Sequence, residues 1–256
     1  MISTLIQQFE TVSAIEPNTA NEPLLRNELN ILLIRAHGLY SRRNPGKADS
    51  EALQRIVQGC HKRLRALQNH ILCDNPPASM KLCGLKDLLD NLAGACDLVL
   101  SETGRRLIFL EPGEEMYLVC SPSQMTSLAL NLVSNACLHT PAKKVYLKLS
   151  PSGGGALVEV ACSGYLNLAN LRAANNRKGC GLMAMNAVAA AHKGSLLFCN
   201  NGGNACAAFY LPFAQDSLSI APTQYETYEP PDFVELLCDR LSPVYTGLCD
   251  VCRCPV

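Results

Sequence analysis

Apolar residues recur at helical spacing through the first third of the chain. Steps of four and three separate Leu25, Leu29, Leu32, Ala36 and Leu39, and a similar rhythm links Leu53, Ile56, Cys60, Leu64, Leu67 and Ile71. The turn residues Arg43-Asn-Pro-Gly46 separate the two runs. The pattern predicts a two-helix hairpin within residues 22–76, able to pair with a second hairpin in a four-helix bundle. Residues 1–21 are expected to form an N-terminal helical segment.

The pattern changes over residues 80–213, where helical and alternating stretches follow one another. Helices are predicted at 85–101, 122–138 and 182–191, and strands at 106–110, 116–119, 145–149, 157–161, 195–199 and 205–211. This order predicts an α+β domain with helices on one face of a mixed sheet. Residues 214–256 contain several prolines and little periodicity, and an extended tail is expected there.

Two amides on the helix predicted at 122–138 are the first candidate chemistry. Asn131 and Asn135 are four residues apart, so they project from one face of the helix. An amide that is buried without a partner costs about 1–3 kcal/mol, which makes the pair unusual on an apolar helix. Their oxygens suit Mg²⁺, and Mg²⁺ commonly accompanies phosphate. Some forty residues later, Gly179 and Gly181 allow backbone N–H groups to approach phosphate at a helix start. Together the two motifs predict a nucleoside triphosphate site.

These motifs resemble those of the ATP-binding domain of sensor histidine kinases, which belongs to the GHKL superfamily of gyrase, Hsp90, histidine kinases and MutL. Residues 122–141 match the N box of that family, and residues 179–194 match its second glycine box and the following helix. The resemblance implies an α/β sandwich after a dimerisation hairpin. It also implies ATP and Mg²⁺ as ligands.

The resemblance assigns roles to individual residues. It implies that Asn135 chelates Mg²⁺ with the help of Asn131, and that His139 lies over the nucleotide. It places Gly179 and Gly181 along the phosphates, with Arg177 and Lys178 available to neutralise charge. Plainer interpretations stay open: a packing or capping amide for Asn135, a favourable C-terminal charge for His139, and solvated loop charges for the two cations.

The first glycine box departs from the family pattern. Cys162 stands where the family has the aspartate that accepts a hydrogen bond from the adenine amine, and Gly164 stands at the first glycine. Leu166 replaces the second glycine. A thiol is a weak acceptor, so adenine loses its main specificity contact. Leu138 also stands where the family often has a basic residue near phosphate. ATP affinity is therefore expected to be weak.

The hairpin departs from the pattern as well. The stretch Leu25-Arg26-Asn27-Glu28-Leu29 resembles remains of the phosphoacceptor signature, but its alignment puts Pro23 at the acceptor position. Proline cannot accept a phosphoryl group. The remaining candidates are His37, His61 and His70, each of which is equally explained as a helix-surface residue. His37 is preferred because it lies on the helix equivalent to the family's acceptor helix.

Composition limits the possible partners. Hydrophobic residues make up 48% of the 256 residues, charged residues make up 17%, and the net charge is zero. The low charge suggests apolar surface covered by a second copy of the chain, and it gives no indication of nucleic acid or an anionic membrane. No stretch approaches a membrane span, and the N-terminus lacks the layout of a signal peptide. A cytoplasmic location is expected.

The fourteen cysteines are mostly scattered through apolar runs, where a free thiol behaves as a small hydrophobe. The exception is the C-terminal group Cys249, Cys252 and Cys254, with Cys238 upstream. It fits either a zinc site or a disordered or loosely docked tail.

Two functions follow from these observations. The first is a cytoplasmic, dimeric, histidine-kinase-like signalling protein that binds Mg·ATP weakly and works with a response-regulator-like partner. The second is a non-catalytic pseudokinase, adaptor or phosphotransferase that uses the fold for dimerisation and protein contacts. The sequence leaves open whether ATP is bound or hydrolysed, and which residue accepts phosphate.

Overall fold

The computed structural model describes residues 2–15, 21–42, 46–74, 80–101, 103–166 and 181–213. The chain divides into two compact units, Met1–Ile71 and Leu72–Val256, which are considered separately below. Within the described residues, no helix is both long and apolar enough to cross a membrane.

The first unit consists of helices α1 (Ile2–Ala14), α2 (Glu22–Arg42) and α3 (Lys47–Asp74). The seam predicted from spacing is its core: the buried residues include Leu25, Leu29, Leu32, Ala36, Leu53, Ile56, Cys60, Leu64 and Leu67. Leu5 of α1 joins the same core. The expected pair of helices is thus confirmed, and α1 adds a third helix to its surface.

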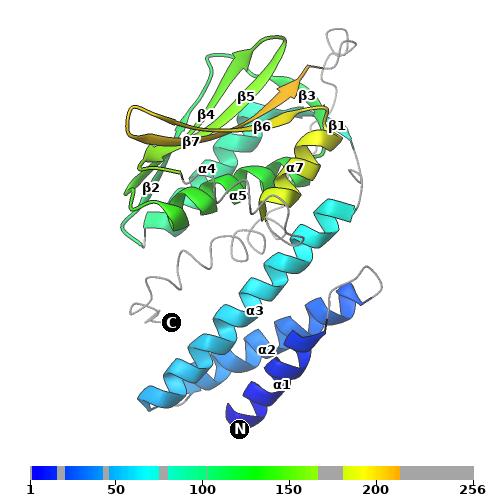
Figure 1. The fold of residues 1–256 in the computed structure, drawn as a ribbon, viewed down its shortest axis with the longest axis vertical. Coiled ribbons are helices and arrows are strands. Elements are labelled where there is room, and N and C mark those ends of the chain that lie inside the picture. Colours follow the sequence, from blue (N-terminus) through cyan, green and yellow to red (C-terminus); the bar gives the residue numbers. More distant parts are fainter. Residues whose placement is uncertain are drawn as a thin grey trace. The chain divides into compact units, whose positions relative to one another are not determined.

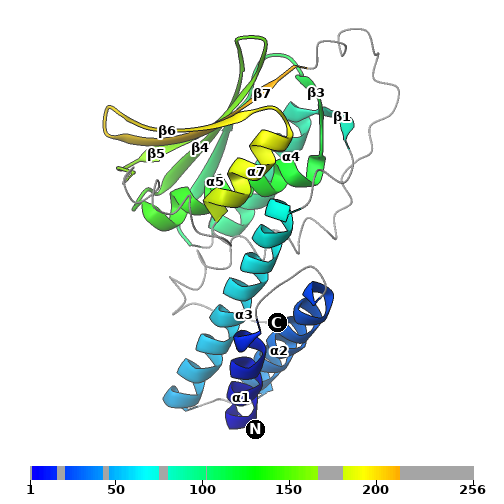
Figure 2. The same cartoon turned by 45° about the vertical axis from the view of Figure 1, so that its right-hand side comes forward.

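The second unit places three helices on one face of a five-stranded sheet. The helices are α4 (Leu85–Ser101), α5 (Pro122–His139) and α7 (Gly181–Ala191). The sheet contains β2 (Arg106–Leu110), β4 (Lys144–Ser152), β5 (Gly155–Ser163), β6 (Ser195–Asn201) and β7 (Asn204–Pro212), in the order β2-β4-β5-β7-β6. Only β2 and β4 run parallel, so the sheet is mixed. The predicted α+β class is confirmed (Figures 1 and 2).

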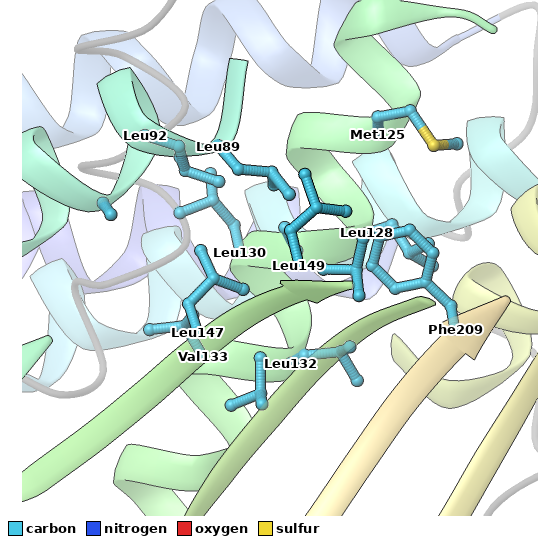
Figure 3. Close-up of a cluster of buried hydrophobic side chains, with 14 of the residues drawn as sticks. Leu89, Leu92, Met125, Leu128, Leu130, Leu132, Val133, Leu147, Leu149 and Phe209 are labelled. Carbon is cyan, nitrogen blue, oxygen red and sulfur yellow. The ribbon is translucent and has the colours of Figure 1, made fainter. Parts of the chain in front are cut away.

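Alternation along the strands separates the two faces of the sheet. On β4, Val145, Leu147 and Leu149 are buried, whereas Lys144, Tyr146 and Lys148 are exposed. The inner face meets Leu128, Leu132 and Val133 of α5 and Leu89 and Leu92 of α4 in one continuous core (Figure 3). The outer face of the sheet carries no helix in the described part of this unit.

One element was missed from the sequence. Strand β1 (Lys81–Gly84) pairs antiparallel with β3 (Tyr117–Cys120) in a separate two-stranded sheet. β3 lies close to the strand predicted at 116–119. Glu115, just before β3, accepts hydrogen bonds from the backbone N–H groups of Lys86 (2.7 Å) and Asp87 (3.1 Å). It therefore caps the start of α4 from outside the helix.

Candidate nucleotide-binding site

Helix α5 carries the two candidate amides and is enclosed by the rest of its unit. Every residue from Gln124 to Ser134 is buried, because α5 packs against α4 and α7 as well as β4, β5 and β7. Asn131 is 5% exposed, and Asn135, one turn later, is half-buried. The two amides thus run from the core toward the surface along one helix face.

Thr140 ends this helix. Its backbone is extended (φ −130, ψ 152), and Pro141 follows it. The Thr140 hydroxyl donates to the carbonyl oxygen of Ala136 (2.7 Å) and accepts from the backbone N–H of Ala142 (3.3 Å). His139, in the last turn, is exposed. The helix end is therefore fixed immediately after the candidate residues.

The end of β5, which corresponds to the first glycine box, packs against this helix end. The sulfur of Cys162 lies 3.4 Å from the Thr140 hydroxyl oxygen. Gly164 has a positive φ of 134, and a Cβ built on it would lie 3.2 Å from the Cβ of Thr140. Because Thr140 uses its own proton on Ala136, the Cys162 thiol is the donor in this contact. The structure thus brings Cys162 and Gly164 together with the end of α5.

The β6–β7 hairpin holds the segment after Gly164. The N–H of Gly164 donates to the carbonyl oxygen of Gly203 (3.0 Å). Asn200 accepts from the Leu166 N–H (2.8 Å) and donates to the Leu166 carbonyl oxygen (3.0 Å). Sequence reasoning gave no role to Thr140, although it lies inside the N box, or to Asn200, which lies outside the motifs. The nearest sequence signals are Pro141, which follows Thr140, and the Asn-Gly-Gly-Asn turn, which follows Asn200.

Helix α7 runs antiparallel to α5. At its C-terminal end, His192 accepts the backbone N–H of Ser121 on Nε2 (3.0 Å), while Nδ1 donates to the carbonyl oxygen of Val188 (2.8 Å). Ser121 immediately precedes α5, so the end of α7 is tied to the start of α5. The opposite end of α7, which begins at Gly181, therefore lies along the part of α5 that leads to the candidate amides (Figures 1 and 2).

A tight helix ending positions His192. Lys193 adopts a positive φ of 56, and the Gly194 N–H bonds to the carbonyl oxygen of Ala189 (2.8 Å). This is a Schellman ending with a lysine where glycine is usual. A Cβ on Gly194 would meet the backbone oxygen of Tyr210, so glycine is required there. His192 and Gly194 thus close α7 before β6 begins.

The predicted site residues divide into three groups. Asn131, Asn135 and His139 lie on α5, Cys162 and Gly164 lie at the adjoining end of β5, and Gly181 begins α7. Arg177, Lys178 and Gly179 lie outside the described residues, as do the tail cysteines considered for zinc. His37 belongs to the other unit. The described residues contain no group of three or more metal-binding side chains. The assigned roles remain predictions.

Comparison with known proteins places this architecture. No family model and no curated protein matches the chain. The Acinetobacter baumannii histidine kinase AdeS aligns with 72% of this chain and 95% of its own, at a TM-score of 0.53 and 16% identity. Full-length ShkA in complex with AMPPNP aligns with 81% of this chain and 46% of its own, at a TM-score of 0.58 and 20% identity. The chain has the fold of a histidine kinase core. At these identities the likeness extends to the fold alone.

The buried His192 makes the stability of this unit depend on pH. Burial lowers the pKa of His192 below its usual 6.5, and the Val188 carbonyl only partly opposes the shift. The folded state therefore binds fewer protons than the unfolded state. The contribution of His192 to the free energy of unfolding is fully present above pH 6.5. It is lost as the pH drops toward the lowered pKa, at a rate of at most about 1.4 kcal/mol per pH unit.

We expect the midpoint of urea unfolding, measured by circular dichroism, to decrease as the pH of the parent protein is lowered from 7 to 5. His192→Gln should be less stable at pH 7 and should lose this part of the slope. His139→Gln is the control, because His139 is an exposed histidine of the same unit. An unchanged slope in His192→Gln would contradict the assignment.

Proposed function

We propose that this chain is a histidine-kinase-like signalling protein whose second unit binds Mg·ATP weakly. The observation that carries the proposal is the packing of Gly164 against Thr140, directly after the helix face of Asn131 and Asn135. This contact puts the first glycine box beside the N box, as the resemblance requires. The histidine kinase fold, seen in ShkA bound to AMPPNP, supports the same conclusion.

The described residues fit the two halves of Mg·ATP unequally. The amide oxygen of the half-buried Asn135 is a suitable ligand for Mg²⁺, and Asn131 would support it from the core. At the adenine end, the Cys162 thiol is 3% exposed and directed at Thr140. This position holds no carboxylate that could accept a hydrogen bond from the adenine amine. The phosphate end therefore carries the affinity, and base selectivity is low.

His37 is the proposed phosphoacceptor. Its side chain reaches solvent on α2, but partial burial of the ring, together with the nearby charge of His61, lowers its pKa. At neutral pH the imidazole is therefore unprotonated, and this is the form that attacks phosphorus. Bound Mg·ATP would supply the phosphoryl group, and a response-regulator-like protein is the partner class that would receive it next.

A second copy of the chain is the proposed partner of the first unit. Leu24 and Ile34 of α2 are 61% and 71% exposed, and the half-buried Ile31 lies between them. Their spacing of seven and three continues the rhythm of a bundle seam on a face that the other helices of this unit leave open. A dimer would cover this face.

The contact between Cys162 and Thr140 favours a second candidate function. A protein that no longer needs ATP can fill the aspartate position with an apolar thiol, and Pro23 occupies the expected acceptor position. An adaptor or phosphotransferase that keeps the fold for dimerisation and protein contacts would show both changes. Nucleotide titration separates this alternative from the first proposal.

Isothermal titration with Mg·ATP tests the site through Asn135. We expect weak binding by the parent and a loss of at least about tenfold in Asn135→Ala, because the metal loses a ligand. Asn91→Ala is the matched control, since Asn91 is an exposed amide on α4 of the same unit. No heat from the parent at millimolar nucleotide would favour the adaptor alternative.

Replacing Cys162 by aspartate tests the adenine end. A carboxylate there restores an acceptor for the adenine amine, so Cys162→Asp should bind ATP at least about tenfold more tightly and should discriminate against GTP. Cys162→Ser, of similar size but uncharged, should change little. If a folded Cys162→Asp binds ATP and GTP as the parent does, the end of β5 is not the base site.

Phosphorylation tests the role of His37. After incubation with γ-labelled Mg·ATP, we expect an acid-labile label on the parent and on His61→Ala, and none on His37→Ala. The two histidines lie close together on neighbouring helices, so His61→Ala controls for a change in packing. An unlabelled parent that nevertheless binds ATP would exclude autophosphorylation and leave the non-catalytic function.

A further inference from the structure

Two cysteines face each other across the β6–β7 hairpin. Cys199 and Cys206 are directly opposed in the antiparallel register. The two-residue turn Gly202-Gly203 fixes this register, because both glycines have positive φ values, 56 and 81, as a type I′ turn requires. The pair Asn201 and Asn204 closes the turn with hydrogen bonds. The cysteine pair, two residues further on, is therefore also a hydrogen-bonded pair.

The Cα spacing of such a pair permits a disulfide. Opposed residues of this type have Cα atoms about 5.5 Å apart, and disulfides join Cα atoms roughly 4.4–6.8 Å apart. Both thiols are free in the structure. The Cβ atoms of a hydrogen-bonded pair lie near the upper end of about 4.5–5.5 Å, beyond the roughly 3.5–4.5 Å of an unstrained disulfide. Closing the bond therefore requires a small shift of the hairpin and gives a strained disulfide that is readily reduced.

The two thiols differ in exposure. Cys199 is exposed and Cys206 is half-buried, whereas Cys60, Cys96, Cys120, Cys137 and Cys162 are buried. Among the cysteines that the structure describes, Cys199 alone is fully open to a reagent. Alternation along β6 and β7 places both thiols on the outer sheet face, away from the helices and from the candidate nucleotide site.

Glu159 distinguishes the chemistry of the two thiols. The Cys206 thiol donates to a carboxylate oxygen of Glu159 on β5 at 3.3 Å. Burial and this carboxylate raise the pKa of Cys206, so its thiol stays protonated at neutral pH. The carboxylate therefore holds Cys206 in the less reactive thiol form. Cys199, which is more accessible, would react first.

We propose that Cys199 and Cys206 form a dithiol site that low-molecular-weight disulfides such as oxidised glutathione convert reversibly to a disulfide. The Cys199 thiolate attacks one sulfur of the reagent, forms a mixed disulfide and releases one thiolate. Cys206 then gives its proton to the released thiolate and attacks the Cys199 sulfur, which releases the second thiolate. Two cysteine thiols are oxidised, one external disulfide is reduced to two thiols, and the two protons end on those thiols.

The test uses the full chain, treated with oxidised glutathione, quenched with iodoacetamide and analysed by mass spectrometry. The tryptic peptide from Gly194 to Arg240 also contains Cys238, so all variants are made in a Cys238→Ser background. We expect this background to form a Cys199–Cys206 disulfide without a lasting glutathione adduct. Reduction with excess glutathione should restore both thiols.

Three variants separate the steps. Cys206→Ser should retain one glutathionyl group on Cys199, because the resolving thiol is gone. Cys199→Ser should form neither product on this peptide. Glu159→Gln should form the internal disulfide faster than the background, because loss of the carboxylate lowers the pKa of Cys206 and makes its thiolate more available. These outward-facing substitutions leave the inner core unchanged, and circular dichroism confirms folding.

Two outcomes would overturn the proposal. One is a stable glutathione adduct on Cys199 while Cys206 is present, which would show that the thiols do not meet. The other is an unreactive pair under conditions that oxidise a control peptide dithiol. Neither outcome depends on whether the chain binds nucleotide.

Discussion

The burial of α5 is the constraint on which the second unit depends. A helix that is buried without interruption from Gln124 to Ser134 needs cover on every side. The sheet supplies one side, and α4 and α7 supply the others. Rotation of the helix about its axis would displace side chains that are packed on all sides. The two amides that emerge near its C-terminal end are therefore held in fixed directions, and this makes a site possible there.

The sequence predicted what depends on periodicity. The seam of α2 and α3, the alternation of β4 and the amide-bearing α5 each repeat a local pattern, and the structure contains all three. Features that depend on long-range contacts were missed. The Glu115 cap on α4 spans 29 residues to Lys86, and β1 is only four residues long with no clear alternation. The need for glycine at position 194 likewise comes from a distant contact, with the backbone of Tyr210.

The contact of Cys162 with Thr140 shows how this fold accommodates a thiol at the end of β5. A buried carboxylate needs hydrogen-bond donors to offset its desolvation, whereas a thiol fills the position at little cost. The Thr140 hydroxyl bonds Ala136 of α5 and accepts from Cys162 of β5. Packing at this position therefore does not require a carboxylate, and the fold does not depend on a nucleotide contact there.

The β6–β7 hairpin contributes side chains to both faces of the sheet. Its register places Asn200 against Leu166, near the candidate site, and places the neighbouring Cys199 on the outer face opposite Cys206. A slip of one residue would reverse both directions, because side chains alternate along a strand. The Gly202-Gly203 turn prevents that slip by setting the loop length and twist. The same backbone turn therefore aligns the edge of the candidate site and the opposed thiols, although the two surfaces share no side chain.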